Sequence, residues 1–229
     1  MKVVILAGGL GTRLSEYTKV IPKPMVKINK KPIINYIIEH YSKFGLNEFY
    51  IATGYKGNII KDYFKNKFKK KKIHIIDTGQ NTMTGGRLKR LKPYLDETFM
   101  MTYGDGISNV NINSLIKFHK KKKKLATLTA VRPPARFGAL KLKNDKVLYF
   151  KEKSKLDEGW INGGFFVMEP AFLNYIKNDQ TFLEREPLET ACRKKELNAF
   201  IHEGFWQCMD TKRDKDYLEK ILRRKKIFE

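Results

Sequence analysis

The sequence predicts an α/β protein with a mostly parallel sheet flanked by helices and a β-rich C-terminal extension. The first observation is the apolar run from Lys2 to Ala7, which ends at two glycines and is typical of a buried parallel strand. The second is the alternation of strand-like and helix-like segments along residues 1–131. The third is the change to short strand-like segments after Pro133-Pro134, with no Ser/Gly-rich linker. We therefore expect one continuous domain.

The elements of the first half follow from apolar spacing. Pro32 to Phe44 has apolar side chains three and four positions apart, begins with proline and is followed by Gly45, as is typical of a helix. Gly85 to Leu95 begins with two glycines, which predicts a loop leading into a helix. Strands are also expected over Lys2–Ala7, Glu48–Thr53, Ile73–Asp77, Thr98–Tyr103 and Leu125–Val131, and helices over Gly57–Phe68 and Asn113–Lys121.

The second half has a different sequence pattern. Short apolar segments bounded by turn residues predict strands that extend the same sheet. These strands are expected over Gly138–Leu142, Lys146–Phe150, Gly164–Met168 and Asn198–Ile201, and helices over Pro170–Lys177, Glu186–Lys195 and Asp214–Arg224.

Composition limits the class of protein. Aromatic residues make up 12% of the 229 residues, which excludes wholesale disorder, and no apolar run approaches the roughly 20 residues of a membrane-spanning helix. A membrane partner is therefore not expected. The two cysteines, Cys192 and Cys208, form no CxxC pair and fit a reducing cytoplasm, where we expect the protein to reside. The four histidines are scattered, so a zinc site is not expected.

The chain is strongly basic: 47 Lys+Arg against 24 Asp+Glu give a net charge of +23. This charge raises nucleic acid, a membrane surface or a phosphate-rich small molecule as partner. The lysine runs Lys69–Lys72 and Lys120–Lys124 follow predicted helices, where lysine complements the helix dipole and stays solvated. Phe64 and Phe68 have the helical spacing of core residues, not the interleaving of a stacking platform. Nucleic acid is therefore not the partner we expect.

The segment from Leu6 to Leu14 (LAGGLGTRL) is a candidate phosphate-binding loop. Glycines after a strand let backbone N–H groups approach phosphate oxygens closely. Neither the dinucleotide pattern nor the P-loop pattern fits, because the third glycine and the Gly-Lys-Ser/Thr sequence are missing. Instead, Arg13 ends the loop and Lys23 follows between two prolines. A guanidinium fork and a point charge in one window predict a triphosphate site.

Two aspartates are candidate metal ligands. Asp105 lies between glycines after a predicted strand, and Asp210 lies near the end of the chain. Mg²⁺ favours one or two carboxylates together with substrate phosphates and waters. The two carboxylates can share one ion if both segments end at the same edge of the sheet. Taken alone, an aspartate between glycines is equally typical of a turn.

Two further clusters have ambiguous patterns. Phe150 to Lys153 is a charged strand end, and Ile161 to Gly164 adds a glycine pair. Together they suit a hydroxylated, phosphorylated substrate, but they are also typical of an exposed edge strand and turn. Thr82 to Leu88 combines small residues with an arginine at a helix start, which suits a base or a phosphate.

These segments together resemble sugar-1-phosphate nucleotidyltransferases. The glycine loop with Pro22-Lys23-Pro24-Met25 is similar to the signature of the whole family. The remaining segments resemble its glucose-1-phosphate cytidylyltransferase branch, and the resemblance runs from Met1 to about Leu222. They are Met83–Arg90, Tyr103–Gly106, Arg136–Leu140, Ile161–Val167, Gly204–Gln207 and Met209–Thr211.

The resemblance implies a Rossmann-like nucleotidyltransferase fold that binds nucleotide in residues 1–131 and sugar in residues 132–229. It implies the reaction of CTP with glucose 1-phosphate to give CDP-glucose and pyrophosphate, with Mg²⁺ as cofactor. Arg13, Lys23, Asp105 and Asp210 are then catalytic, and the two aspartates hold the metal. The implied nucleotide-binding residues are Leu6, Ala7, Gly8, Gly9, Gly11, Thr12, Arg13, Gly86 and Arg87; the implied sugar-phosphate-binding residues are Gly138, Glu152, Lys153 and Asn162.

The chain departs from this pattern in three places. Ser154 and Cys208 replace family prolines, and only Lys69–Lys72 stands where the family carries some two dozen additional residues. UTP or dTTP, or another phosphorylated acceptor, therefore stays open as an alternative, as does a homo-oligomer. A non-catalytic protein on this fold would be expected to lack Lys23, Asp105 or Asp210, and all three are present.

Overall fold

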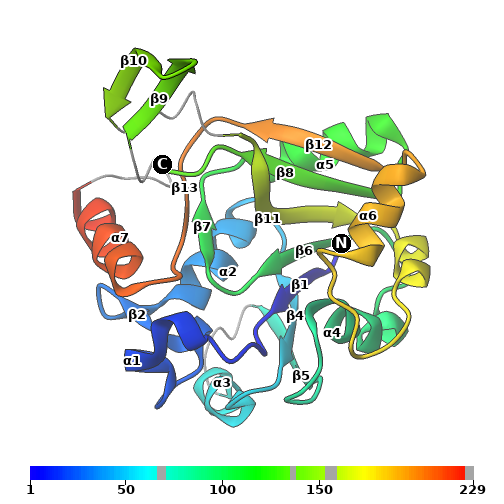
Figure 1. The fold of residues 1–229 in the computed structure, drawn as a ribbon. Coiled ribbons are helices and arrows are strands. Elements are labelled where there is room, and N and C mark those ends of the chain that lie inside the picture. The colour runs from blue at the N-terminus through cyan, green and yellow to red at the C-terminus, as the bar shows by residue number, and fades with distance from the viewer. Residues whose placement is uncertain (66–70, 135–137, 153–158, 225–229) are drawn as a thin grey trace.

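The computed structural model describes residues 1–65, 71–134, 138–152 and 159–224 (Figure 1). In these residues no helix is both long and apolar enough to cross a bilayer. The chain forms one large sheet with helices on both faces, as expected from the alternation of elements.

The central sheet has seven strands in the order β12-β8-β11-β6-β1-β4-β5. Every neighbouring pair is parallel except those made by β11, which runs antiparallel to both β6 and β8. The predicted mostly parallel sheet is thus confirmed, and β11 and β12 extend it as predicted. The strands are β1 (Val3–Leu6), β4 (Glu48–Thr53), β5 (Lys72–Asp77), β6 (Phe99–Tyr103), β8 (Ala126–Val131), β11 (Ile161–Met168) and β12 (Leu197–His202).

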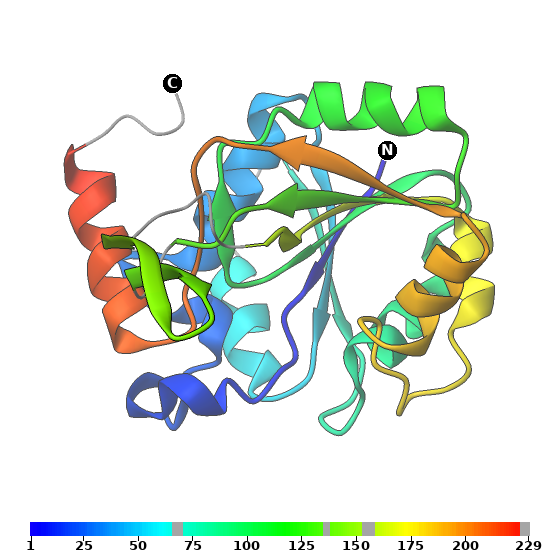
Figure 2. The ribbon, with the colours of Figure 1, turned by 45° about the horizontal axis from the view of Figure 1, so that its top comes forward.

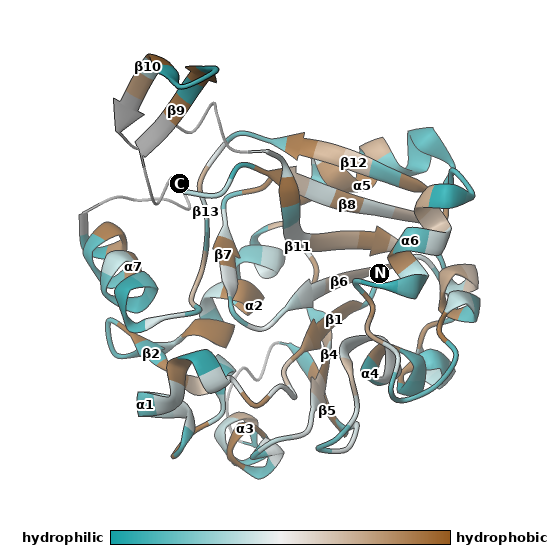
Figure 3. Cartoon of the chain, viewed as in Figure 1, coloured by the Kyte–Doolittle hydropathy of each residue, from teal (hydrophilic) through white to brown (hydrophobic). Residues whose placement is uncertain are grey.

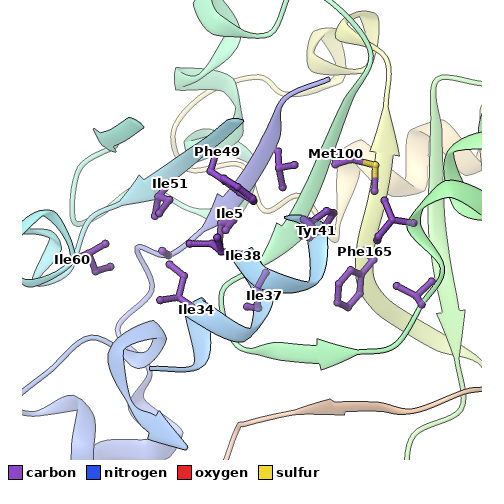
Figure 4. Packing of buried hydrophobic residues seen from close by; sticks show 14 of the residues in the cluster. Ile5, Ile34, Ile37, Ile38, Tyr41, Phe49, Ile51, Ile60, Met100 and Phe165 are labelled. Carbon is purple, nitrogen blue, oxygen red and sulfur yellow. The ribbon is translucent and has the colours of Figure 1, made fainter. Parts of the chain in front are cut away.

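Alternate side chains of the strands build two cores, one on each face. On one face, Val3 and Ile5 of β1 pack with α2 (Ile33–Lys43), α3 (Gly57–Phe64) and α5 (Ile112–Lys122). Figure 4 shows the apolar side of α2 on this face. Figure 2 shows α5 running along β12.

The other face of the sheet carries α4 and α6. Leu88 of α4 (Thr84–Arg90) and Leu188 of α6 (Glu186–Arg193) join Val4 and Leu6 of β1 in its core. Figure 3 shows apolar colour on the central strands and hydrophilic colour along the outer helices.

Small sheets and short helices complete the molecule. Strand β7 (Gly106–Ser108) pairs with β13 (Trp206–Cys208), and β2 (Lys27–Ile28) pairs with β3 (Lys31–Pro32). Strands β9 (Gly138–Lys143) and β10 (Lys146–Glu152) form a hairpin that stands apart from the main sheet in Figure 1. The prediction that these two strands extend the main sheet is wrong, because they pair only with each other among the described residues. The remaining helices are α1 (Ser15–Thr18), α7 (Lys212–Arg224) and 3-10 turns at Thr12–Leu14, Lys23–Met25, Lys92–Tyr94 and Pro170–Tyr175.

Several boundaries differ from the predictions. The glycine-led loop predicted before α4 is wrong, because Gly85 and Gly86 lie inside its first turn. A Cβ on Gly86 would lie 2.3 Å from the backbone oxygen of Asp179, so the glycine permits close packing of helix against loop. The helix predicted from Pro170 is a 3-10 turn. The end predicted for α3, at Phe68, lies outside the described residues.

Candidate active site

Two neighbouring cavities open at the carboxyl ends of the central strands, where ligands bind in sheets of this kind. The first has a volume of about 380 Å³ and the second about 430 Å³. Arg13, Tyr103 and Asp105 line both cavities. Two substrates, one bound in each cavity, would therefore come together beside these three residues.

The glycine loop walls the first cavity. All seven loop residues predicted to bind nucleotide line it: Leu6, Ala7, Gly8, Gly9, Gly11, Thr12 and Arg13. Gly11 has a φ of +65°, and a Cβ there would lie 2.8 Å from Cγ2 of Thr18. Glycine at this position therefore lets the chain turn from β1 into the short helix at Thr12–Leu14. The Thr18 hydroxyl, 3.0 Å from the Gly11 carbonyl oxygen, holds the turn in place.

A four-residue charge cluster lies where the two cavities meet. The Lys23 ammonium donates to Oδ2 of Asp105 and to Oδ1 of Asp210, each at 2.6 Å. Arg13 donates to the other oxygen of Asp210 at 3.0 Å. The structure thus brings together all four residues predicted to be catalytic, from four separate parts of the chain.

Local structure explains why the two aspartates meet. Asp105 lies between β6 and β7, and Asp210 follows β13, which pairs with β7. The backbone N–H of Met209 donates to the carbonyl oxygen of Asp105 at 2.9 Å. Oδ2 of buried Asp214 then accepts from the backbone N–H groups of Asp210 and Thr211, at 3.1 and 2.9 Å. Asp214 is thus a supporting residue that the sequence analysis missed.

The cluster shifts the pKa of its own members. Burial raises the pKa of Asp210, but Lys23 and Arg13 outweigh burial and hold it below its ordinary value. Burial lowers the pKa of Lys23, but the two carboxylates outweigh it and hold that pKa above its ordinary value. Burial and the nearby aspartates raise the pKa of the Cys208 thiol to about 12, so this thiol stays protonated at neutral pH.

The carboxylates of Asp105 and Asp210 fit a hard divalent cation. They already converge on one cationic nitrogen, and two carboxylates with substrate oxygens are the donors that Mg²⁺ favours. No group of three or more His, Cys, Asp or Glu with metal-ligand geometry occurs among the residues that the structure describes. The donor set is therefore suited to a metal that arrives with phosphate ligands of its own.

Arg87 and Gly86 lie differently from the expectation. Arg87 lines the first cavity but is 4% exposed, and its guanidinium donates to backbone and hydroxyl oxygens of the protein. Gly86 packs against the backbone of Asp179 and is not among the residues that line either cavity. The guanidinium of Arg87 therefore makes its hydrogen bonds within the protein, at the wall of the cavity.

The second cavity contains Asn162, the predicted sugar-binding residue of β11. Its Oδ1 accepts from the backbone N–H of Gly164 at 2.9 Å, which fixes the direction of the amide. Its Nδ2 faces the Tyr103 hydroxyl at 3.5 Å, and that hydroxyl donates to Glu184 at 2.6 Å. Neither Tyr103 nor Glu184 was predicted as a site residue. Tyr103 belongs to the Tyr103–Gly106 segment, in which only Asp105 was assigned a role, and Glu184 stands in no distinctive motif.

The β9–β10 hairpin holds two more predicted sugar-binding residues. Gly138 and Glu152 are paired with each other in the register of the hairpin, at its open end. Lys153 follows directly and lies outside the described residues. The backbone therefore places Gly138 and Glu152 side by side, as one subsite would require.

With the fold and site described, comparisons with known proteins identify the family. Residues 2–222 match the family of nucleotidyl transferases, so the chain belongs to that family. Within it, the chain is 50% identical to the glucose-1-phosphate cytidylyltransferase of Salmonella typhimurium, over 96% of this chain and 95% of that protein. The probable glucose-1-phosphate cytidylyltransferase of Bacillus subtilis is 41% identical over 92% of each chain.

Solved structures agree on the fold. HddC from Yersinia pseudotuberculosis, complexed with GMP-PN, matches with a TM-score of 0.75 and 26% identity, over 96% of this chain and 98% of that chain. A putative glucose-1-phosphate thymidylyltransferase from Bacillus anthracis matches with a TM-score of 0.77 and 19% identity, over 98% of this chain and 96% of that chain. The predicted nucleotidyltransferase fold is confirmed.

The lengths of the alignments also differ between relatives. The Salmonella relative aligns over 243 positions, but 96% of this chain's 229 residues is only about 220. The D-glycero-α-D-manno-heptose 1-phosphate guanylyltransferase of Campylobacter jejuni, 32% identical over 93% of its length, aligns over 207 positions with 90% of this chain, about 206 residues. The cytidylyltransferase alignment thus exceeds the aligned part of this chain by some two dozen positions, whereas the guanylyltransferase alignment is about as long as the aligned part of this chain.

Proposed function

We propose that the protein transfers a cytidylyl group from CTP to glucose 1-phosphate and releases pyrophosphate. The observation that supports this activity most strongly is that Asp105, Asp210 and Lys23 converge where the two cavities meet. Both carboxylates lie 2.6 Å from the Lys23 ammonium. The 50% identity to a cytidylyltransferase over nearly the whole chain supports the choice of substrates.

The two cavities are assigned to the two substrates. The triphosphate would lie against the glycine loop, where the residues from Gly8 to Gly11 leave the backbone accessible. The sugar phosphate would lie in the second cavity, with Asn162 facing its hydroxyls and Lys153, Gly138 and Glu152 completing the subsite. Asp105 lies between the two substrates in this arrangement, which places the reacting atoms near the charge cluster.

The reaction needs no general base. An oxygen of the sugar phosphate is already anionic, so it attacks the α-phosphorus of CTP directly. The bond from the α-phosphorus to the bridging oxygen breaks, and pyrophosphate leaves with the electron pair. Lys23 and Arg13 stabilise the charge on the phosphate oxygens, and the walls of the site hold the two substrates in line. Consistent with this, no histidine lines either cavity in the part of the chain that the structure describes.

Asp105 and Asp210 would hold Mg²⁺. When bound, the ion would supply positive charge to the phosphates of the nucleotide. The two carboxylates already pair with one cation, the Lys23 ammonium, in this structure. We further propose a cytoplasmic location, which the free thiols of Cys192 and Cys208 support.

A substrate panel tests the proposal. Pyrophosphate release is measured with Mg²⁺ and with CTP, UTP, dTTP, GTP or ATP, each with and without glucose 1-phosphate. We expect release with CTP and glucose 1-phosphate together, and only background release without the acceptor. Mass spectrometry of the product should give the mass of CDP-glucose. Release with another nucleotide but not with CTP would overturn the nucleotide assignment.

The heptose guanylyltransferase supports a second candidate, because it is 32% identical to this chain and its alignment, unlike that of the cytidylyltransferase, is about as long as the aligned part of this chain. The panel therefore includes GTP with D-glycero-α-D-manno-heptose 1-phosphate. Release with this pair and not with CTP and glucose 1-phosphate would favour guanylyl transfer to a heptose. The charge cluster would then have the same role, but with a different base and acceptor.

A further inference from the structure

We propose that Arg87 is a positioning residue: its buried guanidinium ties the glycine loop of the nucleotide cavity to two neighbouring loops and places a positive charge with no hydrogen-bonded carboxylate beside that cavity. The proposal rests on the proposed function in one respect, namely that this cavity binds the polyphosphate. It assigns Arg87 a role exerted through the glycine loop, not a direct phosphate contact.

The guanidinium joins the ends of three parallel strands. Nη2 donates to the carbonyl oxygen of Gly8, directly after β1, at 2.9 Å. Nη1 donates to the carbonyl oxygen of Thr53, at the end of β4, also at 2.9 Å. After β5, Thr78 Oγ1 and the carbonyl oxygens of Gly79 and Gln80 accept at 2.8, 2.7 and 3.1 Å. One side chain from α4 therefore fixes the relative positions of three loops.

Two glycines form the space in which the guanidinium sits. A Cβ on Gly8 would lie 2.2 Å from Nη1 of Arg87, and a Cβ on Gly54 would lie 2.4 Å from the same atom. Gly54 is not among the residues that line either cavity, so contact with a ligand does not explain it. The absence of a side chain at Gly8 therefore serves Arg87 in addition to any phosphate.

The guanidinium lacks a bonded counter-ion. Its five acceptors are four carbonyl oxygens and one hydroxyl, and none of its acceptors in the described residues is a carboxylate. Burying a charge without a paired opposite charge is costly. The Asp77 carboxylate attracts the guanidinium but is not one of these acceptors. A bound polyphosphate would add negative charge, and burial would weaken the solvent screening between the phosphates and the guanidinium.

We call the hydrogen bonds from Arg87 to the three loops the brace. A lysine at this position could not form it. A planar fork can reach acceptors on three loops at once, whereas an ammonium is a compact point charge with three donors. Arg87→Lys therefore keeps the charge and loses most of the cross-links, while Arg87→Gln loses the charge. The two variants separate the contributions of geometry and charge.

The matched control is Arg90 on the same helix. Arg90 lies about one helical turn after Arg87 in α4. It is exposed and pairs with Asp179, and neither of these two residues lines either cavity. Arg90→Gln removes the same formal charge as Arg87→Gln but none of the hydrogen bonds that join Arg87 to the three loops. A general loss of positive charge would affect both variants equally, whereas a brace at the cavity predicts an effect of Arg87 alone.

The test is calorimetric titration of wild type, Arg87→Lys, Arg87→Gln and Arg90→Gln with inorganic triphosphate, CTP and CMP, below each protein's unfolding temperature. We expect Arg87→Gln to weaken triphosphate and CTP binding by about 10- to 100-fold and CMP binding less, because CMP carries less charge. Arg87→Lys should fall between this variant and wild type. Arg90→Gln should stay within about twofold of wild type, as expected for an exposed charge.

A second variant reaches the brace from outside the cavity. Gly54→Ala should displace the guanidinium and weaken triphosphate binding, although Gly54 touches no ligand in this assignment. If folded Arg87 variants bind triphosphate like wild type and only their unfolding temperature falls, Arg87 is a structural residue and the proposal is wrong. If wild type binds no triphosphate, the proposal is also wrong. If wild type binds triphosphate but transfers no cytidylyl group, only the proposed function fails.

Discussion

At the residue scale, Lys23 is held by two carboxylates at the junction of the cavities. Its position follows from the sequence around it, since prolines on both sides limit the backbone and a short 3-10 helix begins at Lys23. The side chain is 13% exposed, so its attraction to Asp105 and Asp210 is less screened than at an open surface. We therefore expect Lys23 to contribute both to the free energy of unfolding and to the catalytic activity.

The first prediction concerns this lysine. Lys23→Met should lower kcat/KM for CTP by about 10²–10³-fold, because it removes a cation from the developing phosphate charge. It should also lower the free energy of unfolding by about 1–3 kcal/mol, because it leaves two carboxylates without their partner. Steady-state kinetics and urea unfolding check the two effects. Lys27→Met, an exposed lysine of β2, is the control and should change neither.

The sequence predicted some of these residues and not others, for physical reasons. The sequence predicted that Asp105 and Asp210 could share one ion if both segments ended at the same edge of the sheet, but only Asp105 followed a predicted strand. The burial of Arg87 could not be predicted, because an arginine at a helix start is ordinarily solvated. Glu184 likewise carries no pattern that distinguishes it from a surface glutamate. Its position depends on a loop that only the folded chain brings to Tyr103.

At the element scale, an irregularity in β11 shapes the second cavity. The pairing of β11 with β8 shifts register between Asn162 and Phe166. Gly164, within the shift, has a φ of +78°, which an L side chain rarely adopts. A Cβ there would lie 2.6 Å from Cδ2 of Tyr103. The bulge thus leaves room for Tyr103 and directs Asn162 into the cavity.

This geometry gives the second prediction. Gly164→Ala should lower the free energy of unfolding by about 1–3 kcal/mol through backbone strain. By displacing Tyr103, it should also raise KM for the sugar phosphate more than KM for the nucleotide. Gly159→Ala is the matched control, since a Cβ on Gly159 meets no atom within 4 Å. Equal effects of the two substitutions would show that the bulge has no special role.

Element-scale prediction from sequence succeeded for the long elements. The apolar spacing of α2 and the continuous apolar run of β1 gave both within one or two residues. Strands β7 and β13 were missed because three residues are too few to show a period. The pairing of these two short strands brings Asp105 and Asp210 together. The two aspartates could be predicted as site residues from the sequence, but the strands that position them could not.

At the scale of the whole molecule, the sheet order brings residues from both halves of the chain to one edge. Strand β11, from the second half, lies between β6 and β8 of the first half. Alternating strands and helices predicted the parallel part of the sheet, but the antiparallel insertion of β11 is a long-range pairing without a local signal. The two predicted halves therefore share one sheet.

The third prediction is a pH dependence of global stability. Because the folded pKa of Asp210 is lowered from 3.8, its carboxylate adds stability above the unfolded pKa, and this is lost as pH falls through the folded pKa. Urea unfolding of wild type and Asp210→Asn should therefore differ most at pH 5–7 and converge below about pH 4. Lys23 acts in the opposite direction, with a pKa raised from 10.5, so its contribution holds below that pH and is lost in strong alkali. A constant difference from pH 7 to pH 2 would contradict the ion pairing.

The central claim is that two carboxylates and a lysine form the reaction centre of a nucleotidyltransferase. Its most direct test is pyrophosphate release from CTP and glucose 1-phosphate by wild type, Asp105→Asn and Asp210→Asn, with Mg²⁺ and with circular dichroism to verify folding. We predict release by the wild type and a loss of at least about 10²-fold in each folded variant, because a metal ligand and the partner of Lys23 are removed together. Wild-type rates in both folded variants would contradict the account.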